Sequence, residues 1–188
     1  MSEAPLSICV YCGSRPGADP AYVGAAQDLG SAIGAKGWRL VYGAGDVGLM
    51  GEVARTAQSA GAETFGVIPE HLVKMEVGKV DLSKYIVTEN MHERKKVMFM
   101  NANAITVLPG GAGSLDEFFE VLTWAQLGLH NKPIILLDIA GYWHPLLSLI
   151  DHIIDQGFAS PSLKELFTTA DSVDSALSQL ELTLNLKQ

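Results

Sequence analysis

Short apolar runs alternate with longer amphipathic stretches along the whole sequence. The runs are rich in β-branched residues and lack in/out alternation, which indicates strands buried on both faces. We expect strands at residues 6–11, 38–42, 63–68, 85–88, 104–108, 133–137 and 167–169. Apolar positions at helical spacing predict helices at residues 20–36, 49–60, 91–102, 115–129, 142–156 and 172–184. Residues 71–83 are polar without a clear period, so we expect an irregular segment or a short helix there.

Capping residues support several of these boundaries. Asp19 is a candidate N-cap with Pro20 at the first helical position, and Gly37 can end the helix that follows. Asn90 and Ser114 are candidate N-caps of two later helices.

Strands that alternate with helices predict an α/β fold, a doubly wound, Rossmann-like parallel sheet formed by residues 1–188 as a single domain. Ligands of such folds bind at the carboxyl ends of the strands. Three glycine-rich loops, at residues 13–17, 43–48 and 110–113, fall at that edge. The candidate ligand contacts in the first two loops are Gly13, Ser14, Gly43 and Gly45.

Composition narrows the classes of function. The chain has 188 residues, of which 48% are hydrophobic and only 18% charged, as in a folded globular domain. A net charge of −8 disfavours binding to nucleic acid. The longest aliphatic run, Ile134 to Leu137, is too short to cross a membrane, and the first residues show no signal peptide. We therefore expect a cytoplasmic protein that binds neither nucleic acid nor membrane.

The stretch from Leu108 to Glu120 combines a strand end, a glycine-rich loop and a helix start. Its glycines allow close approach of the backbone to a ligand, and the amides and dipole at a helix start favour a phosphate. Ser114 and Glu117 also fit a capping box, which is the plain structural alternative. We favour a functional Glu117 because three glycines exceed what a cap needs and a first-turn carboxylate can reach a bound ligand.

Gly43 to Gly48 matches the dinucleotide-binding pattern G-x-G-x-x-G. The acid that this pattern requires is misplaced, because Glu63 begins the next strand and Glu70 follows its end. An NAD-dependent oxidoreductase is therefore disfavoured. Tight packing of a strand against a helix is the structural alternative for these glycines.

Two further motifs are weak indications of redox or metal chemistry. Cys9 and Cys12 form C-x-x-C on a predicted strand, where residues three apart face opposite sides, so we expect two ordinary thiols. His92-Glu93 begins a zinc motif, but Lys96 stands in place of its second histidine, so we expect no metal.

Arg94 and Lys95 lie in the first turn of a predicted helix, where cations oppose the helix dipole. A solvated charged face is the simple interpretation. An anion or a carboxylate nearby would compensate the cost, and we favour a functional Arg94, since arginine binds carboxylate or phosphate with two parallel bonds.

Two long motifs resemble those of one family. P-G-G-x-G-[ST]-x-x-E spans Pro109 to Glu117, and M-H-E-R-K spans Met91 to Lys95. Shorter matches are C-G-S at 12–14, G-L-M-G at 48–51, T-W-A-Q-L-G at 123–128 and G-Y-W at 141–143. The chain is thus similar, over almost its whole length, to the Lonely guy (LOG) family of cytokinin riboside 5′-monophosphate phosphoribohydrolases, often mislabelled lysine decarboxylases.

The resemblance implies hydrolysis of the N-glycosidic bond of AMP and N6-modified nucleoside 5′-monophosphates, without a cofactor, by a homodimer with its site near the subunit contact. Carried over, Arg94 and Glu117 are the catalytic pair. The other implied substrate contacts are Glu76, Lys95, Gly110, Gly111, Ala112, Gly113, Ser114 and Thr123. Apolar and aromatic residues between Trp124 and Leu129 could form the dimer surface.

Two positions depart from the family pattern. Gly43-Ala44-Gly45 stands in place of a glycine triplet, and Ser114 replaces the commoner threonine but keeps its hydroxyl. The main competing function is a non-catalytic carrier of a nucleotide or of molybdenum cofactor on the same fold. Such a carrier does not need the pair of Arg94 and Glu117. A lysine decarboxylase would need a Schiff-base lysine and pyridoxal phosphate, and the sequence singles out no such lysine.

Overall fold

The computed structural model describes residues 5–73 and 78–185. Within these residues, seven parallel strands form one sheet in the order β4-β3-β2-β1-β5-β6-β7. The strands are β1 (Ser7–Tyr11), β2 (Arg39–Tyr42), β3 (Glu63–Pro69), β4 (Lys84–Thr88), β5 (Ala104–Val107), β6 (Ile134–Leu137) and β7 (Thr168–Ala170). The predicted doubly wound α/β sheet is therefore confirmed.

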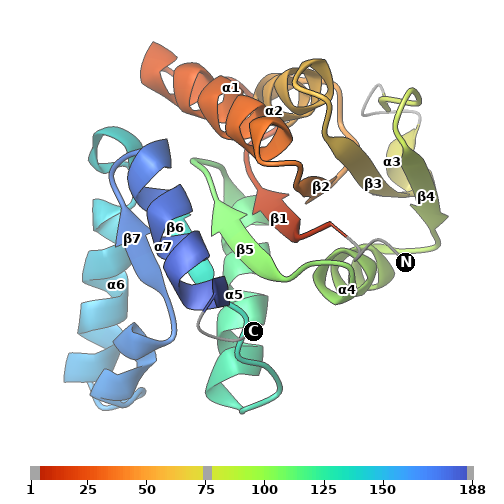
Figure 1. Cartoon of the computed structure of the whole chain (residues 1–188). Helices are drawn as coiled ribbons and strands as arrows, with labels where there is room; N and C mark the ends of the chain where they lie inside the picture. The colour runs from red at the N-terminus through yellow and green to blue at the C-terminus, as the bar shows by residue number, and fades with distance from the viewer. Residues whose placement is uncertain (1–4, 74–77, 186–188) are drawn as a thin grey trace.

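Helices cover both faces of the sheet (Figure 1). The α-helices are α1 (Pro20–Ala35), α2 (Gly48–Ser59), α3 (Glu70–Val73), α4 (Met91–Met100), α5 (Ala112–Gln126), α6 (His144–Asp155) and α7 (Val173–Asn185). Two 3-10 turns, η1 (Ile139–Gly141) and η2 (Pro161–Glu165), flank α6. α1, α2 and α7 pack on one face, and α4, α5 and α6 pack on the other.

The central strand β1 divides its side chains between two apolar cores. Ile8 and Val10 belong to the core under α1, α2 and α7, whereas Cys9 and Tyr11 belong to the core under α4, α5 and α6. All four side chains are buried. Burial on both sides explains why the strand sequence shows no alternation of apolar and polar residues.

Most predicted boundaries agree with the structure to within two residues. Asp19 caps α1 by accepting a hydrogen bond from the amide of Ala21 at 2.9 Å. Asn90 caps α4 by accepting one from the amide of Glu93 at 3.0 Å. The segment predicted as irregular or a short helix begins with α3.

The predicted start of α5 is wrong. The N-cap is Gly111, and the helix begins at Ala112, so Ser114 is its third residue and not its cap. The helix can start inside the glycine loop because Gly113 has an ordinary helical backbone and Gly110 leaves room for the buried Ser114 side chain. A capping box of Ser114 with Glu117 is therefore not formed, and Glu117 lies in the second turn instead of the first.

The start of α6 also differs from the prediction. We expected the helix to begin at Tyr142, but it begins at His144. Ala140 and Gly141 have positive φ values of 53° and 72°, so the chain turns sharply before the helix. This turn leaves Tyr142 outside the helix, near the carboxyl ends of the central strands.

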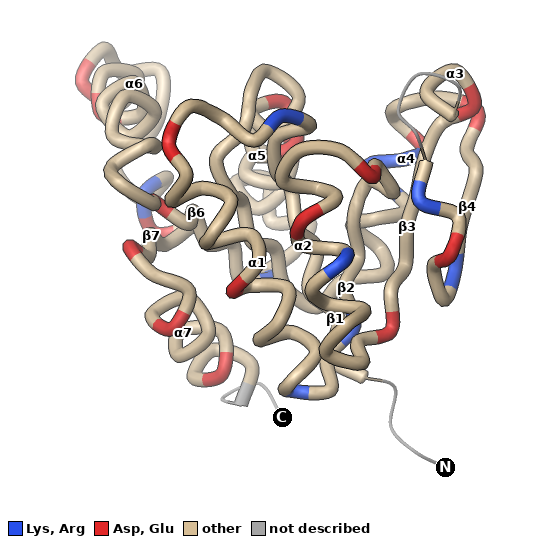
Figure 2. The backbone as a smooth tube through the Cα atoms, turned by 90° about the horizontal axis from the view of Figure 1, so that it is seen from above, with Lys and Arg blue, Asp and Glu red and all other residues tan. Residues whose placement is uncertain are grey.

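The charge distribution follows the composition. Acidic residues lie along α6 and α7 and around α3, whereas basic residues are spread over separate elements apart from the run at the start of α4 (Figure 2). In the described ranges, every helix is too short or too polar to span a bilayer.

The strand order reverses between β1 and β5, which pair directly, with Tyr11 beside Val107. The loops after these strands therefore lie side by side. The amide of Gly13 donates to the carbonyl of Pro109 at 3.0 Å, and the amide of Leu49 at the start of α2 donates to the carbonyl of Gly13 at 3.1 Å. All three predicted glycine-rich loops thus meet at the switch point, where doubly wound folds bind their ligands.

Candidate active site

A cavity of about 640 Å³ opens at this switch point. The loops after β1 and β5, the start of α5, and residues of α1, α2, α3 and α4 surround it. Its lining combines charged and polar residues with several sulfur-containing or aromatic side chains. The lining includes the residues Tyr11, Cys12, Tyr22, Arg94, Ser114, Glu117 and Tyr142.

The start of α5 presents its backbone amides to the cavity. The first helical hydrogen bond runs from the amide of Leu115 to the carbonyl of Gly111 at 3.1 Å. Within the described part of the chain, the amides of residues 111–114 donate to no other protein group. The 15-residue helix α5 begins here, so the positive end of its dipole lies at the cavity. These amides therefore form a favourable place for an anion.

The glycines of this loop serve two different purposes. A Cβ on Gly110 would lie 2.0 Å from the Ser114 hydroxyl oxygen, so packing requires glycine there. A Cβ on Gly111 or Gly113 would meet no atom within 4 Å. Packing within the chain therefore does not explain these two glycines, whereas a ligand that approaches the backbone closely would explain both.

Arg94 reaches the cavity from α4 and is only 4% exposed. Its Nε donates to the carbonyl of Val67 at 3.0 Å, and its Nη2 donates to the carbonyl of Gly43 at 2.6 Å. A carbonyl within β3 and one directly after β2 thus hold the guanidinium. The solvated charged face that the sequence allowed is therefore excluded for Arg94.

Glu117 lines the same cavity from the second turn of α5. Tyr11, at the end of β1, is close enough to Glu117 for the two groups to interact electrostatically. Burial raises the pKa of the Tyr11 phenol well above its usual value, and the nearby Cys9 and Glu117 raise it further. Tyr11 is therefore a neutral phenol beside the carboxylate at physiological pH.

Lys95 does not line the cavity and is also 4% exposed. Its ammonium donates to Asp116 at 2.9 Å and to Glu120 at 2.7 Å, on either side of Glu117 in α5. Two carboxylates thus compensate this cation, which lies in the second turn of α4 rather than in the first turn as predicted. The ion pairs tie α4, which carries Arg94, to α5, which carries Glu117.

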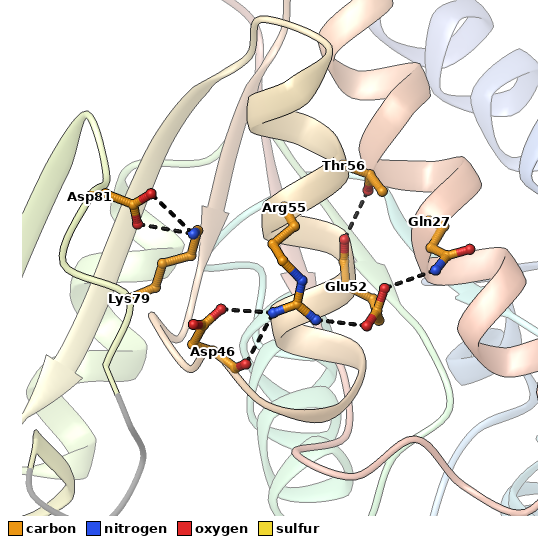
Figure 3. Close-up of polar contacts among 7 residues, drawn as sticks. All are labelled: Gln27, Asp46, Glu52, Arg55, Thr56, Lys79 and Asp81. Atoms are coloured by element: carbon orange, nitrogen blue, oxygen red, sulfur yellow. Dashed lines mark hydrogen bonds and ion pairs between the residues drawn. The ribbon is translucent and has the colours of Figure 1, made fainter.

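A network on the surface holds the loop between β2 and α2 (Figure 3). Arg55 donates to the side chain of Asp46 at 2.8 Å and to its carbonyl at 3.2 Å, and also to Glu52 at 2.6 Å. Glu52 in turn accepts from Gln27 of α1 at 2.8 Å. The loop that presents the Gly43 carbonyl to Arg94 is therefore fixed from its outer side.

Comparison of the sequence with a family model and with curated relatives gives the same family. The model of the family described as possible lysine decarboxylase matches residues 50–180. The probable cytokinin riboside 5′-monophosphate phosphoribohydrolase LOG4 of Oryza sativa subsp. japonica is 43% identical, over 93% of this chain and 76% of its own length. LOG3 and LOG7 of Arabidopsis thaliana, both cytokinin riboside 5′-monophosphate phosphoribohydrolases, are 40% and 42% identical over 93% of this chain, covering 81% and 80% of their own lengths.

This chain belongs to the LOG family. Its fold is also that of solved molybdenum-cofactor proteins, at a much lower identity. The molybdenum cofactor binding protein of Rippkaea orientalis matches with a TM-score of 0.73 and 24% identity, and the Moco carrier protein of Chlamydomonas rheinhardtii with 0.71 and 22%, each over 97% of this chain and 99% of the other. These likenesses establish the fold alone.

The structure of this LOG-family chain brings together most of the residues that the sequence singled out. The cavity is lined by Gly13, Ser14, Gly43, Arg94, Gly110, Gly111, Ala112, Gly113, Ser114 and Glu117. It is not lined by Lys95, Thr123 or Gly45. Thr123 is exposed on α5, and Gly45 pairs with Gly78. Glu76 lies outside the described residues.

Sequence reasoning missed the role of several cavity residues in this LOG-family fold. Tyr22 and Tyr142 face the cavity and pack edge to face, with ring centroids 5.4 Å apart. The G-Y-W motif at 141–143 was the available signal, but its position at a predicted helix start concealed the contact of Tyr142 with the glycine loop.

Among the described residues, the cavity lining contains no lysine that could form a Schiff base with pyridoxal phosphate. No group of three or more His, Cys, Asp or Glu in the described ranges could hold a metal ion.

Proposed function

We propose that this protein hydrolyses the N-glycosidic bond of nucleoside 5′-monophosphates, AMP and N6-modified adenosine monophosphates, to a free base and ribose 5-phosphate. The observation that carries the proposal is one cavity lined by both Arg94 and Glu117 and by the amides at the start of α5. Relatives that are 40% to 43% identical bear the name of this activity.

Substrate binding starts from the phosphate. The amides of residues 111–114 offer hydrogen bonds to its oxygens, and the dipole of α5 favours its charge. Backbone amides suit this chain because Arg15 and Arg94 are the two cations that line the cavity among the described residues. Anchoring the remote phosphate contributes binding energy that orients the ribose at the reacting carbon.

In the chemical step, the bond between C1′ of the ribose and the base nitrogen breaks, and its electron pair leaves with the base. Positive charge develops on the ribose, as in other glycoside hydrolyses. The Glu117 carboxylate stabilises that charge and accepts a proton from the water that attacks C1′. The departing base takes up a proton from solvent, and Glu117 afterwards releases its proton to solvent. Arg94, held by the Val67 and Gly43 carbonyls, orients Glu117 or grips the phosphate.

The apolar residues Met100, Leu127 and Leu129 support a homodimer as the working form. They are 68%, 67% and 68% exposed. They lie at the neighbouring C-terminal ends of α4 and α5, where Phe99 packs on Trp124 with centroids 5.0 Å apart. A second copy of the chain would cover them. Sedimentation of the wild type and of a Leu127→Glu, Leu129→Glu variant tests this, and a wild type that stays monomeric would reject it.

A direct assay tests the activity. Purified protein is incubated with AMP and with N6-isopentenyladenosine monophosphate, and the free base and ribose 5-phosphate are measured. We expect Glu117→Gln to lower turnover by about 10²–10⁴-fold or more, since a positioned base supplies that factor, while AMP still binds. Asp28→Asn, an exposed acid on α1, is the matched control and should keep full activity.

The competing function is a carrier of a nucleotide or of molybdenum cofactor, because one fold can host different functions. The same assay separates the two. Release of neither adenine nor the modified base by the wild type, together with tight binding of the nucleotide, would support the carrier.

A further inference from the structure

The peptide groups of the phosphate loop are held in one orientation, and Tyr142 supplies one of the restraints. The carbonyl of Pro109 accepts from the amide of Gly13 at 3.0 Å, and the carbonyl of Gly111 accepts from the amide of Leu115 at 3.1 Å. The carbonyl between them, that of Gly110, accepts from the hydroxyl of Tyr142 at 2.5 Å. Among the described contacts, this middle restraint is the one that comes from a side chain.

Fixing a carbonyl also fixes the amide that follows it. A trans peptide group is planar, so its C=O and N–H point in opposite directions, and the described chain contains no cis bond. When the Gly110 carbonyl points at Tyr142, the Gly111 amide must point the other way. The Gly111 amide is one of the donors at the start of α5 that find no partner within the described chain.

This peptide group is the one in the loop most able to flip. It lies between Gly110 and Gly111, and glycines permit backbone rotations that other residues resist. A larger residue could not stiffen the loop at position 110, because its Cβ would lie 2.0 Å from the Ser114 hydroxyl oxygen and 2.9 Å from the Gly13 amide nitrogen. A flipped peptide would turn its carbonyl oxygen toward a bound anion and repel it.

The surroundings of Tyr142 are built to keep its hydroxyl in place. Its ring packs edge to face on Tyr22 and on the buried Trp143, with centroids 5.4 Å and 4.7 Å away. The amide of Trp143 donates to Asp138 at 2.6 Å. Ala140, two residues before Tyr142, has a left-handed backbone with φ of 53° and ψ of 29°, a strained conformation that persists only where the surrounding structure enforces it.

We propose that Tyr142 is a positioning residue of the phosphate site: its hydroxyl holds the Gly110 carbonyl away from the anion and so keeps the Gly111 amide available to it. The inference rests on the proposed function, in that the anion is taken to be the 5′-phosphate of the substrate. It adds a residue that acts on phosphate recognition through another group, without touching the reacting atoms.

The test compares ligands with and without a phosphate. Tyr142→Phe removes only the hydroxyl, and Tyr85→Phe is the matched control, because the buried Tyr85 hydroxyl has no hydrogen-bond partner in the described residues. Calorimetry measures the affinity of each protein for inorganic phosphate, ribose 5-phosphate and adenosine. We expect Tyr142→Phe to weaken the two phosphate ligands about 3- to 10-fold, the range for loss of one hydrogen bond, and to leave adenosine unchanged.

Kinetics with AMP give a second readout. The KM should rise by a similar factor with a smaller change in kcat, because the phosphate is held in ground state and transition state alike. Unchanged phosphate affinity in Tyr142→Phe would overturn the inference, and so would an equal loss of adenosine affinity, which indicates general loosening of the cavity.

A measurement on the wild type covers the case in which the variant does not fold. With ¹⁵N-glycine labelling, the Gly111 amide signal should move downfield when inorganic phosphate is added, and no shift would reject the proposal. The outcomes also distinguish failure of this inference from failure of the proposed function. A wild type that binds phosphate in a Tyr142-dependent way but cleaves no AMP would reject the activity alone, and one that cleaves AMP equally well without the hydroxyl would reject only the role of Tyr142.

Discussion

The guanidinium of Arg94 lies against the backbone of Gly43, with 2.6 Å between Nη2 and the carbonyl oxygen. A Cβ at position 43 would stand 2.2 Å from the same nitrogen. The glycine that opens the G-x-G-x-x-G pattern therefore makes room for a buried arginine of α4. This contact accounts for Gly43 without a dinucleotide and agrees with the packing alternative for that motif.

Replacing Gly43 with alanine should impair catalysis much more than folding. The added methyl group meets the far end of a flexible side chain, so the fold can adjust at a cost of about 1 kcal/mol in the free energy of unfolding. The displaced guanidinium, however, should lower kcat/KM for AMP by about 100-fold, as a misplacement of roughly 1 Å can. Urea unfolding and steady-state kinetics measure the two effects. Undiminished kcat/KM would show that the position of Arg94 is unimportant.

Gly113→Ala should make the protein more stable and a poorer binder of nucleotide. Gly113 lies in α5 with open space where its Cβ would be, so alanine should add roughly 0.5–1 kcal/mol to the free energy of unfolding. The same methyl group would stand where phosphate approaches the amides, and we expect AMP affinity to fall about tenfold or more, since those hydrogen bonds need about 3 Å.

Gly24 provides the control for that trade-off. It also lies within a helix, α1, and its Cβ would meet nothing within 4 Å, but it does not line the cavity. Gly24→Ala should therefore gain the same stability and keep wild-type affinity for AMP. If Gly113→Ala also kept it, the phosphate could not lie close to the start of α5.

Lys95→Met should loosen the tie between α4 and α5. Because Asp116 and Glu120 are 62% and 21% exposed, we expect the free energy of unfolding to fall by about 1–2 kcal/mol, which is below the range for fully buried pairs. Turnover should fall with it, since α4 carries Arg94 and α5 carries Glu117. Lys96→Met, at an exposed neighbouring position, should change neither quantity. Weaker AMP binding by Lys95→Met with unchanged stability would instead favour the direct substrate contact that the family resemblance implied.

The pH dependence of that stability difference has a defined sign. Burial lowers the pKa of the Lys95 ammonium, but its hydrogen bonds with Glu120 and Asp116 outweigh this effect, so the pKa in the folded protein is raised above the ordinary value of 10.5. The stabilisation is therefore complete below that value and is lost as the pH rises through the folded pKa. The difference between wild type and Lys95→Met should stay constant from about pH 7 to 9 and shrink at more alkaline pH.

The sequence was sufficient for the sheet, the switch point and the glycine loops, because these follow from hydrophobic periodicity and from glycine and proline positions. The caps of α1 and α4 were predictable for the same local reason, since Asp19 and Asn90 bond to amides two and three residues away. The start of α5 was not predictable in this way. Ser114 is an excellent cap locally, but its burial against Gly110 overrides that preference.

The parts of the site that escaped prediction depend on contacts between distant residues. The bonds of Arg94 to Val67 and Gly43 span 27 and 51 positions, and that of Tyr142 to Gly110 spans 32. None of these three contacts has a local pattern, because the acceptors are main-chain carbonyls, which every residue has. Gly43 was an indirect sign of its contact with Arg94, because a residue with a Cβ would leave no space for the guanidinium.

The two cysteines should behave as inert thiols in spite of their C-x-x-C spacing. Both are free and buried, and they belong to the apolar cores on opposite faces of the sheet, as the strand geometry predicted. Burial, reinforced by the Glu117 carboxylate, raises the pKa of each thiol far above its usual value, so both stay protonated between pH 6 and about pH 9. The native protein should therefore react very slowly with a thiol reagent at pH 8, and denaturant should release two reactive thiols. Fast labelling of native Cys12, which lines the cavity, would show that its thiolate is accessible and would reopen a chemical role for it.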